Sequence, residues 1–193
     1  PECISVSSAM HGLIAVDSAG QPLSNCIIWA DRRSEHIAVA LEASEAGRLL
    51  YQQTGTPIHP MSLLCKLMWI KSNDQKLFAQ SHKFIGIKEF LFYRLFGVYV
   101  VDHSIASATG LFDIHHLTWS DQALSLAGIS EEQLASPVPV DYILNMPCQK
   151  IAALMQIPED TPFVIGGSDG CLANLGVGAI SPGVASVTIG TSG

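Results

Sequence analysis

The stretch TPFVI at residues 161–165 runs directly into GGSDG at residues 166–170, and this junction is the most informative feature of the sequence. An apolar run that ends in glycines predicts a strand followed by a sharp turn, since glycine tolerates backbone angles that other residues avoid. A second junction of this kind joins Val184–Ile189 to GTSG at residues 190–193. A carboxylate at the first turn can accept a proton from a hydroxyl group, and N–H and hydroxyl groups at the second can hold phosphate oxygens. Together the two turns predict phosphoryl transfer to a small hydroxylated molecule.

Asp169, the carboxylate of the first turn, has two roles open to it, and they do not exclude each other. It can act as a general base that deprotonates or orients a hydroxyl group. It can also cap the helix expected to begin near Gly170, because Asp is a common N-cap and a helix N-terminus stabilises its charge. The local sequence leaves both roles open.

The composition is that of a globular protein with an acidic charge balance. Of 193 residues, 48% are hydrophobic and 14% are charged, and 17 acidic side chains outnumber 10 basic ones. No basic cluster is interleaved with aromatic residues, which argues against nucleic acid as a partner. No apolar run approaches the ~18 residues of a membrane span, and residues 1–20 do not resemble a signal peptide.

The cysteines stand far apart, in no C-x-x-C pair and no metal-finger spacing. Scattered thiols in apolar stretches indicate a reduced, cytoplasmic protein in which cysteine serves as a small buried hydrophobic residue. The five are Cys3, Cys26, Cys65, Cys148 and Cys171.

Strand and helix patterns alternate along the chain, which predicts an α/β architecture. Ser34 and Asp102 precede helical periodicity as N-caps, while Gly55 and Gly97 close helices. Three prolines within 135–147 predict a connection between two units. Helices are predicted near 35–41, 43–53, 63–70, 89–95, 102–107, 120–127, 131–134 and 148–156, and strands near 4–8, 13–16, 26–29, 84–87 and 98–101.

Several further residues could carry chemistry, and each has an ordinary explanation beside the functional one. His11, between Met10 and Gly12, could donate to a substrate hydroxyl group or simply bond to the backbone. Trp29 could pack against the C–H groups of a sugar or serve as a core aromatic residue. His115 and His116 could suggest a metal, but adjacent side chains point apart, so a solvated loop is the preferred interpretation.

Seven short motifs, taken in order, resemble the FGGY family of carbohydrate kinases. They extend from about Cys3 to Gly193 and so cover essentially the whole chain. Each motif is loose alone, but seven in the order of the family are specific. They are SSAMHG (7–12), IWADRRS (28–34), KLMW (66–69), DHSIAS (102–107), LFD (111–113), GGSD (166–169) and GTSG (190–193).

The resemblance implies two domains of the actin-like ATPase, ribonuclease H-like fold, with substrate and ATP in the cleft between them. Residues 1–147 would be the remainder of the N-terminal, sugar-binding domain, and residues 148–193 the start of the C-terminal, ATP-binding domain. It assigns Asp169 as the catalytic base. It implies that the sugar-binding residues are Met10, His11, Gly12, Trp29 and Met61, and that the phosphate-binding residues are Gly190, Thr191 and Ser192.

Within the family, three features are most similar to the bacterial gluconokinases: the segment TGTPIHPMS at residues 54–62, the Ser-Ala-Met-His-Gly start and the Gly-Ser-Asp-Gly turn. This similarity implies phosphorylation of the 6-hydroxyl group of D-gluconate with ATP and Mg²⁺. From their positive charge, and not from a motif, Arg33 or Lys66 is expected to be a partner of the substrate carboxylate. Xylulose or another sugar or polyol is the alternative substrate. A sugar-binding module without catalysis, or a metal-dependent hydrolase built on His115 and His116, is the alternative class. A homodimer is one possible assembly.

The chain also departs from the family pattern. Leu63 stands where the signature around Lys66 usually has Pro, Ser or Thr, and Asp102-His103 replaces the commoner Asp-Tyr pair. The resemblance further places a D-x-G-T-T/S phosphate loop before Pro1 and an adenosine-binding half after Gly193. The sequence is therefore expected to be a piece of a longer protein and to be inactive alone.

Overall fold

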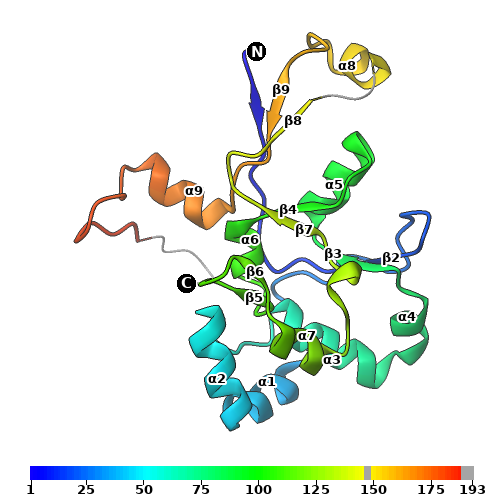
Figure 1. The fold of residues 1–193 in the computed structure, drawn as a ribbon, viewed down its shortest axis with the longest axis vertical. Coiled ribbons are helices and arrows are strands. Elements are labelled where there is room, and N and C mark those ends of the chain that lie inside the picture. The colour runs from blue at the N-terminus through cyan, green and yellow to red at the C-terminus, as the bar shows by residue number, and fades with distance from the viewer. Residues whose placement is uncertain (146–148, 188–193) are drawn as a thin grey trace.

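The structure is a computed structural model that describes residues 1–145 and 149–187, in which helices and short strands alternate as predicted (Figure 1). The helices are α1 (Glu35–Glu42), α2 (Glu45–Thr54), α3 (Leu63–Asn73), α4 (Gln75–Gln80), α5 (Ile87–Phe96), α6 (His103–Ser107), α7 (Asp121–Ala127), α8 (Gln149–Met155) and α9 (Asp169–Gly176), with a 3-10 turn, η1 (Glu131–Gln133). The strands are β1 (Ile4–Ser5), β2 (Ile14–Val16), β3 (Lys83–Ile85), β4 (Val100–Asp102), β5 (Phe112–Asp113), β6 (Thr118–Trp119), β7 (Ser136–Val138), β8 (Ile143–Asn145) and β9 (Pro162–Val164).

Strand β9 lies beside the first strand of the chain. It pairs in parallel with β1, where Ile4 lies opposite Phe163, and antiparallel with β8 on its other side. A further bridge joins Ser8 to Ser168 just beyond the strands. The remaining described pairs are β2 with β3, β4 with β7, and β5 with β6. The pairing with β1 and the bridge beyond it place the turn after β9 beside the segment that follows β1 (Figure 1).

The main hydrophobic core lies where α1, α2, α3 and α7 gather at the lower end of the molecule in Figure 1. Leu50, Leu64, Leu67 and Ile70 are fully buried there. A second cluster fills the space between α5 and the β1–β9–β8 sheet, with the Phe96 and Phe163 rings packed edge to face at 5.2 Å. Burial of these apolar side chains supplies the driving force that holds the elements in place.

Most predicted helix ends are confirmed. The Asp102 side chain accepts hydrogen bonds from the backbone N–H groups of Ser104 and Ile105 at the start of α6. Gly55 and Gly97 end α2 and α5 with φ of 66° and 73°, the left-handed conformation that favours glycine. Ser34 precedes α1 but does not cap it through its side chain, because its hydroxyl group donates to the carbonyl oxygen of Pro60.

Several strand predictions are wrong. Residues 26–29 form no strand and make a single bridge, Leu13 to Ile27. The stretch 135–147, predicted as a connection, contains β7 and β8, which pair with β4 and β9. These strands depend on partners that are distant in sequence, so local patterns do not reveal them. Residues 184–187 of the predicted strand 184–189 lie outside any strand, and its last two residues are outside the described part.

The expectation that the cysteines are buried is confirmed only in part. Cys65 is buried and Cys26 is half-buried, but Cys3 and Cys171 are exposed, while Cys148 lies outside the described residues. No helix in the described ranges 1–145 and 149–187 is long and apolar enough to span a membrane. The proposed division between residues 147 and 148 stays a prediction; β8 and β9, which lie on either side of it, are paired.

Candidate active site

Side chains from four separate stretches of the chain line one open pocket of about 200 Å³, here called the Asp169 pocket. The structure thus brings together Asp169 and four of the five predicted sugar-binding residues. Gly12 is not among the lining residues. The pocket is lined by Ala9, Met10, His11, Trp29, Met61 and Asp169.

The backbone around Asp169 is fixed by bonds to neighbouring segments. Ser168, and not Asp169, is the N-cap of α9, and its hydroxyl group accepts from the N–H of Cys171. The N–H of Asp169 donates to the Ser8 carbonyl oxygen at 3.0 Å. One carboxylate oxygen, Oδ1, accepts from the N–H of Gly170, while Oδ2 accepts no hydrogen bond within the described part of the chain. The exposed carboxylate therefore keeps one oxygen for a ligand in the pocket.

His11 occupies a turn whose backbone is in the left-handed region, with φ of 65°. Its Nδ1 is buried and has no hydrogen-bond partner among the described residues. Burial, followed by the charges of Lys66 and His59, lowers the pKa of the imidazole, which favours the neutral ring. Gly12 lies behind this turn, where an added Cβ would stand 3.3 Å from the Cys26 sulfur, so its small size serves packing.

Lys66 holds the backbone of two segments that line the Asp169 pocket. Its side chain is buried, and Nζ donates to the carbonyl oxygens of His11 at 2.5 Å, Ile28 at 3.0 Å and Ile27 at 3.2 Å. Burial lowers the pKa of this ammonium group to about 8. Because its three donors are used on the backbone that carries His11 and Trp29, Lys66 positions these residues.

The other cation suggested for the substrate carboxylate is also engaged elsewhere. The Arg33 guanidinium group makes two hydrogen bonds to the Asp31 carboxylate, at 2.9 and 2.8 Å, and lies 4.9 Å over the Trp69 ring. Neither Arg33 nor Lys66 lines the Asp169 pocket.

A larger pocket of about 570 Å³ adjoins the Asp169 pocket and shares Met10, His11 and Met61 with it. Most of its wall comes from the 54–62 segment, in which Met61 is the one residue predicted to bind the sugar. The N–H of Met61 donates to Nδ1 of His59, so Nε2 is the ring nitrogen that carries a proton. The remaining lining residues are Thr54, Gly55, Thr56, Pro57, Ser62, Ser107, Ala108 and Ile114.

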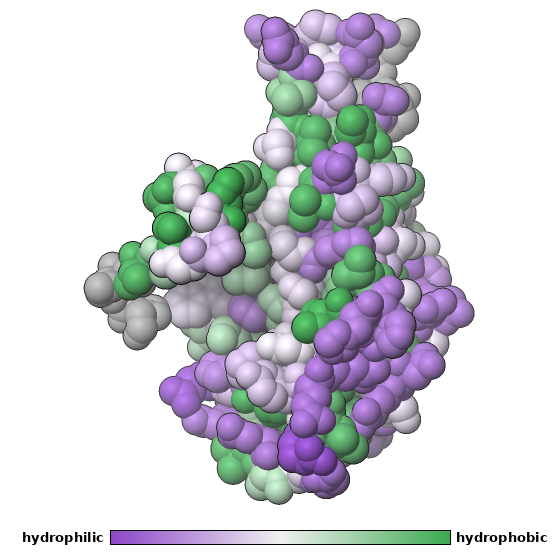
Figure 2. Space-filling model, turned by 60° about the vertical axis from the view of Figure 1, so that its left-hand side comes forward, coloured by the Kyte–Doolittle hydropathy of each residue, from purple (hydrophilic) through white to green (hydrophobic). Residues whose placement is uncertain are grey.

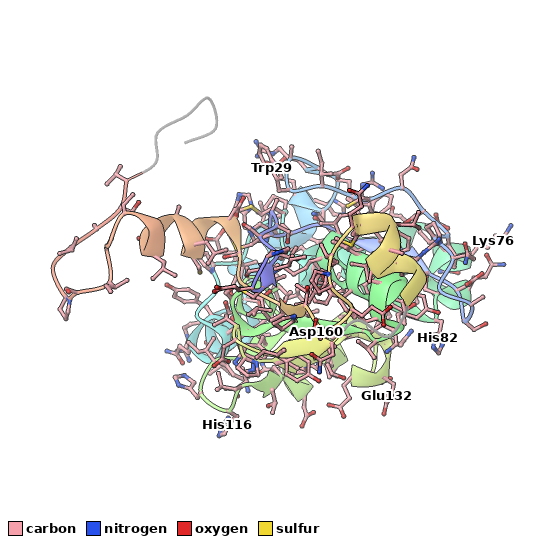
Figure 3. The ribbon with its side chains drawn as sticks, turned by 90° about the horizontal axis from the view of Figure 1, so that it is seen from above. Trp29, Lys76, His82, His116, Glu132 and Asp160 are labelled. Carbon is pink, nitrogen blue, oxygen red and sulfur yellow. The ribbon has the colours of Figure 1, made fainter. Side chains whose placement is uncertain are left out.

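The pair His115-His116 lies in the exposed turn between β5 and β6, as the preferred interpretation predicted. Figure 3 places His116 and Trp29 at opposite edges of the molecule. Nδ1 of His116 lies 2.9 Å from Asp113, and this contact lowers the pKa of the Asp113 carboxyl group. Within the described ranges, no three His, Cys, Asp or Glu side chains are arranged to hold a metal ion. The predicted phosphate-binding residues Gly190, Thr191 and Ser192 lie outside the described part.

Comparison with solved structures defines the class of protein. The fold matches the crystal structure of a gluconate kinase from Lactobacillus acidophilus with a TM-score of 0.89 and 35% identity, over 93% of this chain and 36% of that one. A glycerol kinase from Plasmodium falciparum shares the fold at a TM-score of 0.82 and 20% identity, over 94% of this chain and 37% of that one. The chain has the actin-like ATPase fold of the sugar kinases.

Sequence comparison then identifies the family. Residues 1–176 match the N-terminal domain of the FGGY family of carbohydrate kinases, and the chain belongs to this family. It is 48% identical to the gluconokinase of Bacillus licheniformis over 100% of its own length and 38% of that protein's. It is 30% identical to the xylulose kinase of Bacillus subtilis (strain 168) over 98% of this chain and 38% of that protein. The chain thus spans less than two fifths of these relatives.

Proposed function

We propose that this chain supplies the sugar-binding wall and the catalytic base of an ATP-dependent gluconokinase, a phosphotransferase that converts D-gluconate to 6-phosphogluconate. The observation that carries the proposal is the Asp169 pocket. A carboxylate with one oxygen free faces Met10, His11, Trp29 and Met61 across a space open to a small molecule. The 48% identity to a gluconokinase supports gluconate as the substrate.

In this proposal Asp169 accepts the proton of the 6-hydroxyl group while the hydroxyl oxygen attacks the γ-phosphorus of ATP. The new bond joins that oxygen to phosphorus, the bond from phosphorus to the β,γ-bridging oxygen breaks, and ADP leaves. Phosphoryl transfer needs alignment and charge neutralisation more than covalent help from the protein. Mg²⁺ would offset the phosphate charge, held by residues outside those described.

The site residues divide into two groups in this proposal. Trp29 and Met10 present apolar surface to the C–H face of the substrate, since sugars pack well on exposed rings. His11 lines both pockets, where its ring can meet a substrate hydroxyl group. With Arg33 and Lys66 engaged elsewhere, His59 is the basic side chain in the larger pocket that is best placed to meet the gluconate carboxylate, through Nε2.

Substitution of the base tests the proposal. A positioned general base contributes about 10²–10⁴ in rate, so Asp169→Asn in the full-length kinase should lower kcat by that factor while the affinity for gluconate changes little. Asp160→Asn is the matched control, because Asp160 is an exposed carboxylate at the opposite end of β9. Turnover by Asp169→Asn at the rate of the unmodified enzyme would refute the assignment.

Xylulose is the second candidate substrate. It is favoured by the ligand-bound xylulose kinase of Lactobacillus acidophilus, which matches this fold with a TM-score of 0.89 and 35% identity. Thermal-shift measurements with gluconate, xylulose and glycerol, with and without ATP, separate the two candidates. A larger shift with xylulose than with gluconate would replace the proposed substrate, and a sugar-dependent shift without turnover would indicate a binding module.

A further inference from the structure

Lys88 and Asp102 form an ion pair that is buried completely and yet lines neither pocket. Lys88 Nζ lies 2.8 Å from Asp102 Oδ2, and the two side chains are 1% and 0% exposed. Buried pairs are poor stabilisers on balance, because the loss of hydration offsets much of their attraction. The other hydrogen bonds of the pair show what it does.

Lys88 holds the turn that precedes Asp169. Besides its bond to Asp102, Nζ donates to the carbonyl oxygens of Ile165 at 3.0 Å and Gly167 at 3.2 Å. These carbonyl groups stand on either side of Gly166. The three donors of the ammonium group are therefore divided between the carboxylate and the two arms of one turn.

Asp102 reaches the same turn from the other side. Its second oxygen, Oδ1, accepts from the N–H groups of Ser104 and Ile105 and from the Ser104 hydroxyl group. The Ser104 hydroxyl oxygen in turn accepts from the N–H of Ser168 at 2.8 Å. The network thus ends one residue before Asp169.

The glycines of the turn pack closely against neighbouring segments and leave little room for a side chain. Gly166 has φ of 69°, and an added Cβ would stand 2.5 Å from the Val6 carbonyl oxygen. An added Cβ on Gly167 would stand 3.3 Å from the Ser104 hydroxyl oxygen. Close backbone packing and the buried network together define where the chain enters α9.

We propose that Lys88, Asp102 and Ser104 are positioning residues that hold the Gly166–Ser168 turn so that the Asp169 carboxylate faces its pocket. The proposal rests on the proposed function, because it assumes that Asp169 is the base. None of the three touches the substrate space, so they act on the rate only through Asp169. A displacement of about 1 Å in a catalytic group costs up to ~100-fold in rate.

The test uses the full-length kinase and variants that avoid a lone buried charge. Ser104→Ala removes the bond to the Ser168 N–H, and the double variant Lys88→Met with Asp102→Asn removes both charges together. We expect kcat to fall about tenfold for Ser104→Ala and up to ~100-fold for the double variant, with KM for gluconate changed less than about threefold. Lys83→Met is the matched control, because Lys83 also donates to two carbonyl oxygens, those of Glu132 and Leu134, but away from the pocket. It should leave kcat unchanged.

A double-mutant cycle separates positioning from general destabilisation. If the network acts through Asp169, Ser104→Ala should lower the residual kcat of Asp169→Asn less than about twofold. Ser104→Ala with the kcat of the unmodified enzyme, or a loss of the same size in the Asp169→Asn background, would overturn the inference. The proposed function fails separately, if Asp169→Asn itself keeps full turnover.

Discussion

Glu89 is a buried carboxyl group that the candidate active site does not use. It lies at the start of α5, is 5% exposed, and its Oε2 has no hydrogen-bond partner among the described residues. Burial, with the negative charge of Asp102 adding to it, raises the pKa of Glu89 to about 7. Nearby Lys88 and the N–H groups of Gly86 and Glu89 lower the pKa but do not outweigh burial.

This shift predicts how stability depends on pH. A carboxyl group whose pKa is higher in the folded state binds protons more tightly when folded. Its contribution to the free energy of unfolding is therefore complete below about pH 4.5 and is lost as the pH rises through about 7. Glu89→Gln should remove this pH-dependent loss. The difference in free energy of unfolding between the variant and the unmodified protein should therefore be larger at pH 8 than at pH 5, by on the order of a few kcal/mol. Urea unfolding at both pH values measures it, with exposed Glu42→Gln as the control. An equal difference at both pH values would contradict the prediction.

At the scale of elements, the turn that leads into α9 contains a glycine, Gly166, that cannot readily be replaced. Gly166 and Gly97 both adopt positive φ, at 69° and 73°. An added Cβ at Gly97 meets nothing within 4 Å, whereas at Gly166 it stands 2.5 Å from a backbone oxygen. The two positions therefore separate the cost of the left-handed conformation from the cost of a steric clash.

Alanine substitution of the two glycines tests this difference. The left-handed conformation alone costs about 1–2 kcal/mol for a residue with a Cβ, so Gly97→Ala should lower the free energy of unfolding by that amount. Gly166→Ala should cost at least about 1 kcal/mol more, because the backbone must also shift to relieve the clash. Equal losses in denaturant unfolding would show that the turn can move freely.

At the scale of the whole molecule, the β1–β9–β8 sheet connects the start of the chain to the Asp169 turn. Phe163 in the middle of this sheet is 2% exposed and packs on Phe96. In contrast, α9 and the segment after it project from the body, and Figure 2 shows hydrophobic residues on this lobe. Leu175, Val177 and Ile180 there are 59%, 69% and 72% exposed.

The two regions should respond differently to truncation. Phe163→Ala should lower the free energy of unfolding by about 3–5 kcal/mol, the usual cost of removing a buried ring. Ile180→Ala should change it by less than about 0.5 kcal/mol, because most of that side chain is already in solvent. Thermal unfolding of both variants checks the contrast, and a large loss for Ile180→Ala would mean that its surface is covered in the folded protein.

Most helix ends and the chemical groups of the site could be predicted from local sequence. Helix signals at Asp102, Gly55 and Gly97 are local, since a cap bonds to residues within one turn. The Gly-Gly-Ser-Asp turn and the Met-His-Gly turn were likewise visible as short motifs. The family resemblance predicted that both contribute to one substrate site. No local signal set the strand pairs or showed that Ser168 caps α9 in place of Asp169.

The way these groups come together depends on contacts between distant parts of the folded chain. Parallel pairing of β1 with β9 and the bridge from Ser8 to Ser168 bring Asp169 to Met10 across more than 150 residues of chain. Lys66 and Lys88, charged residues in apolar stretches, are explained only by the groups that folding places around them. These are backbone carbonyl groups for both lysines and the Asp102 carboxylate for Lys88. Strand pairing and buried hydrogen bonds join residues distant in sequence, so their partners exist only once the chain has folded.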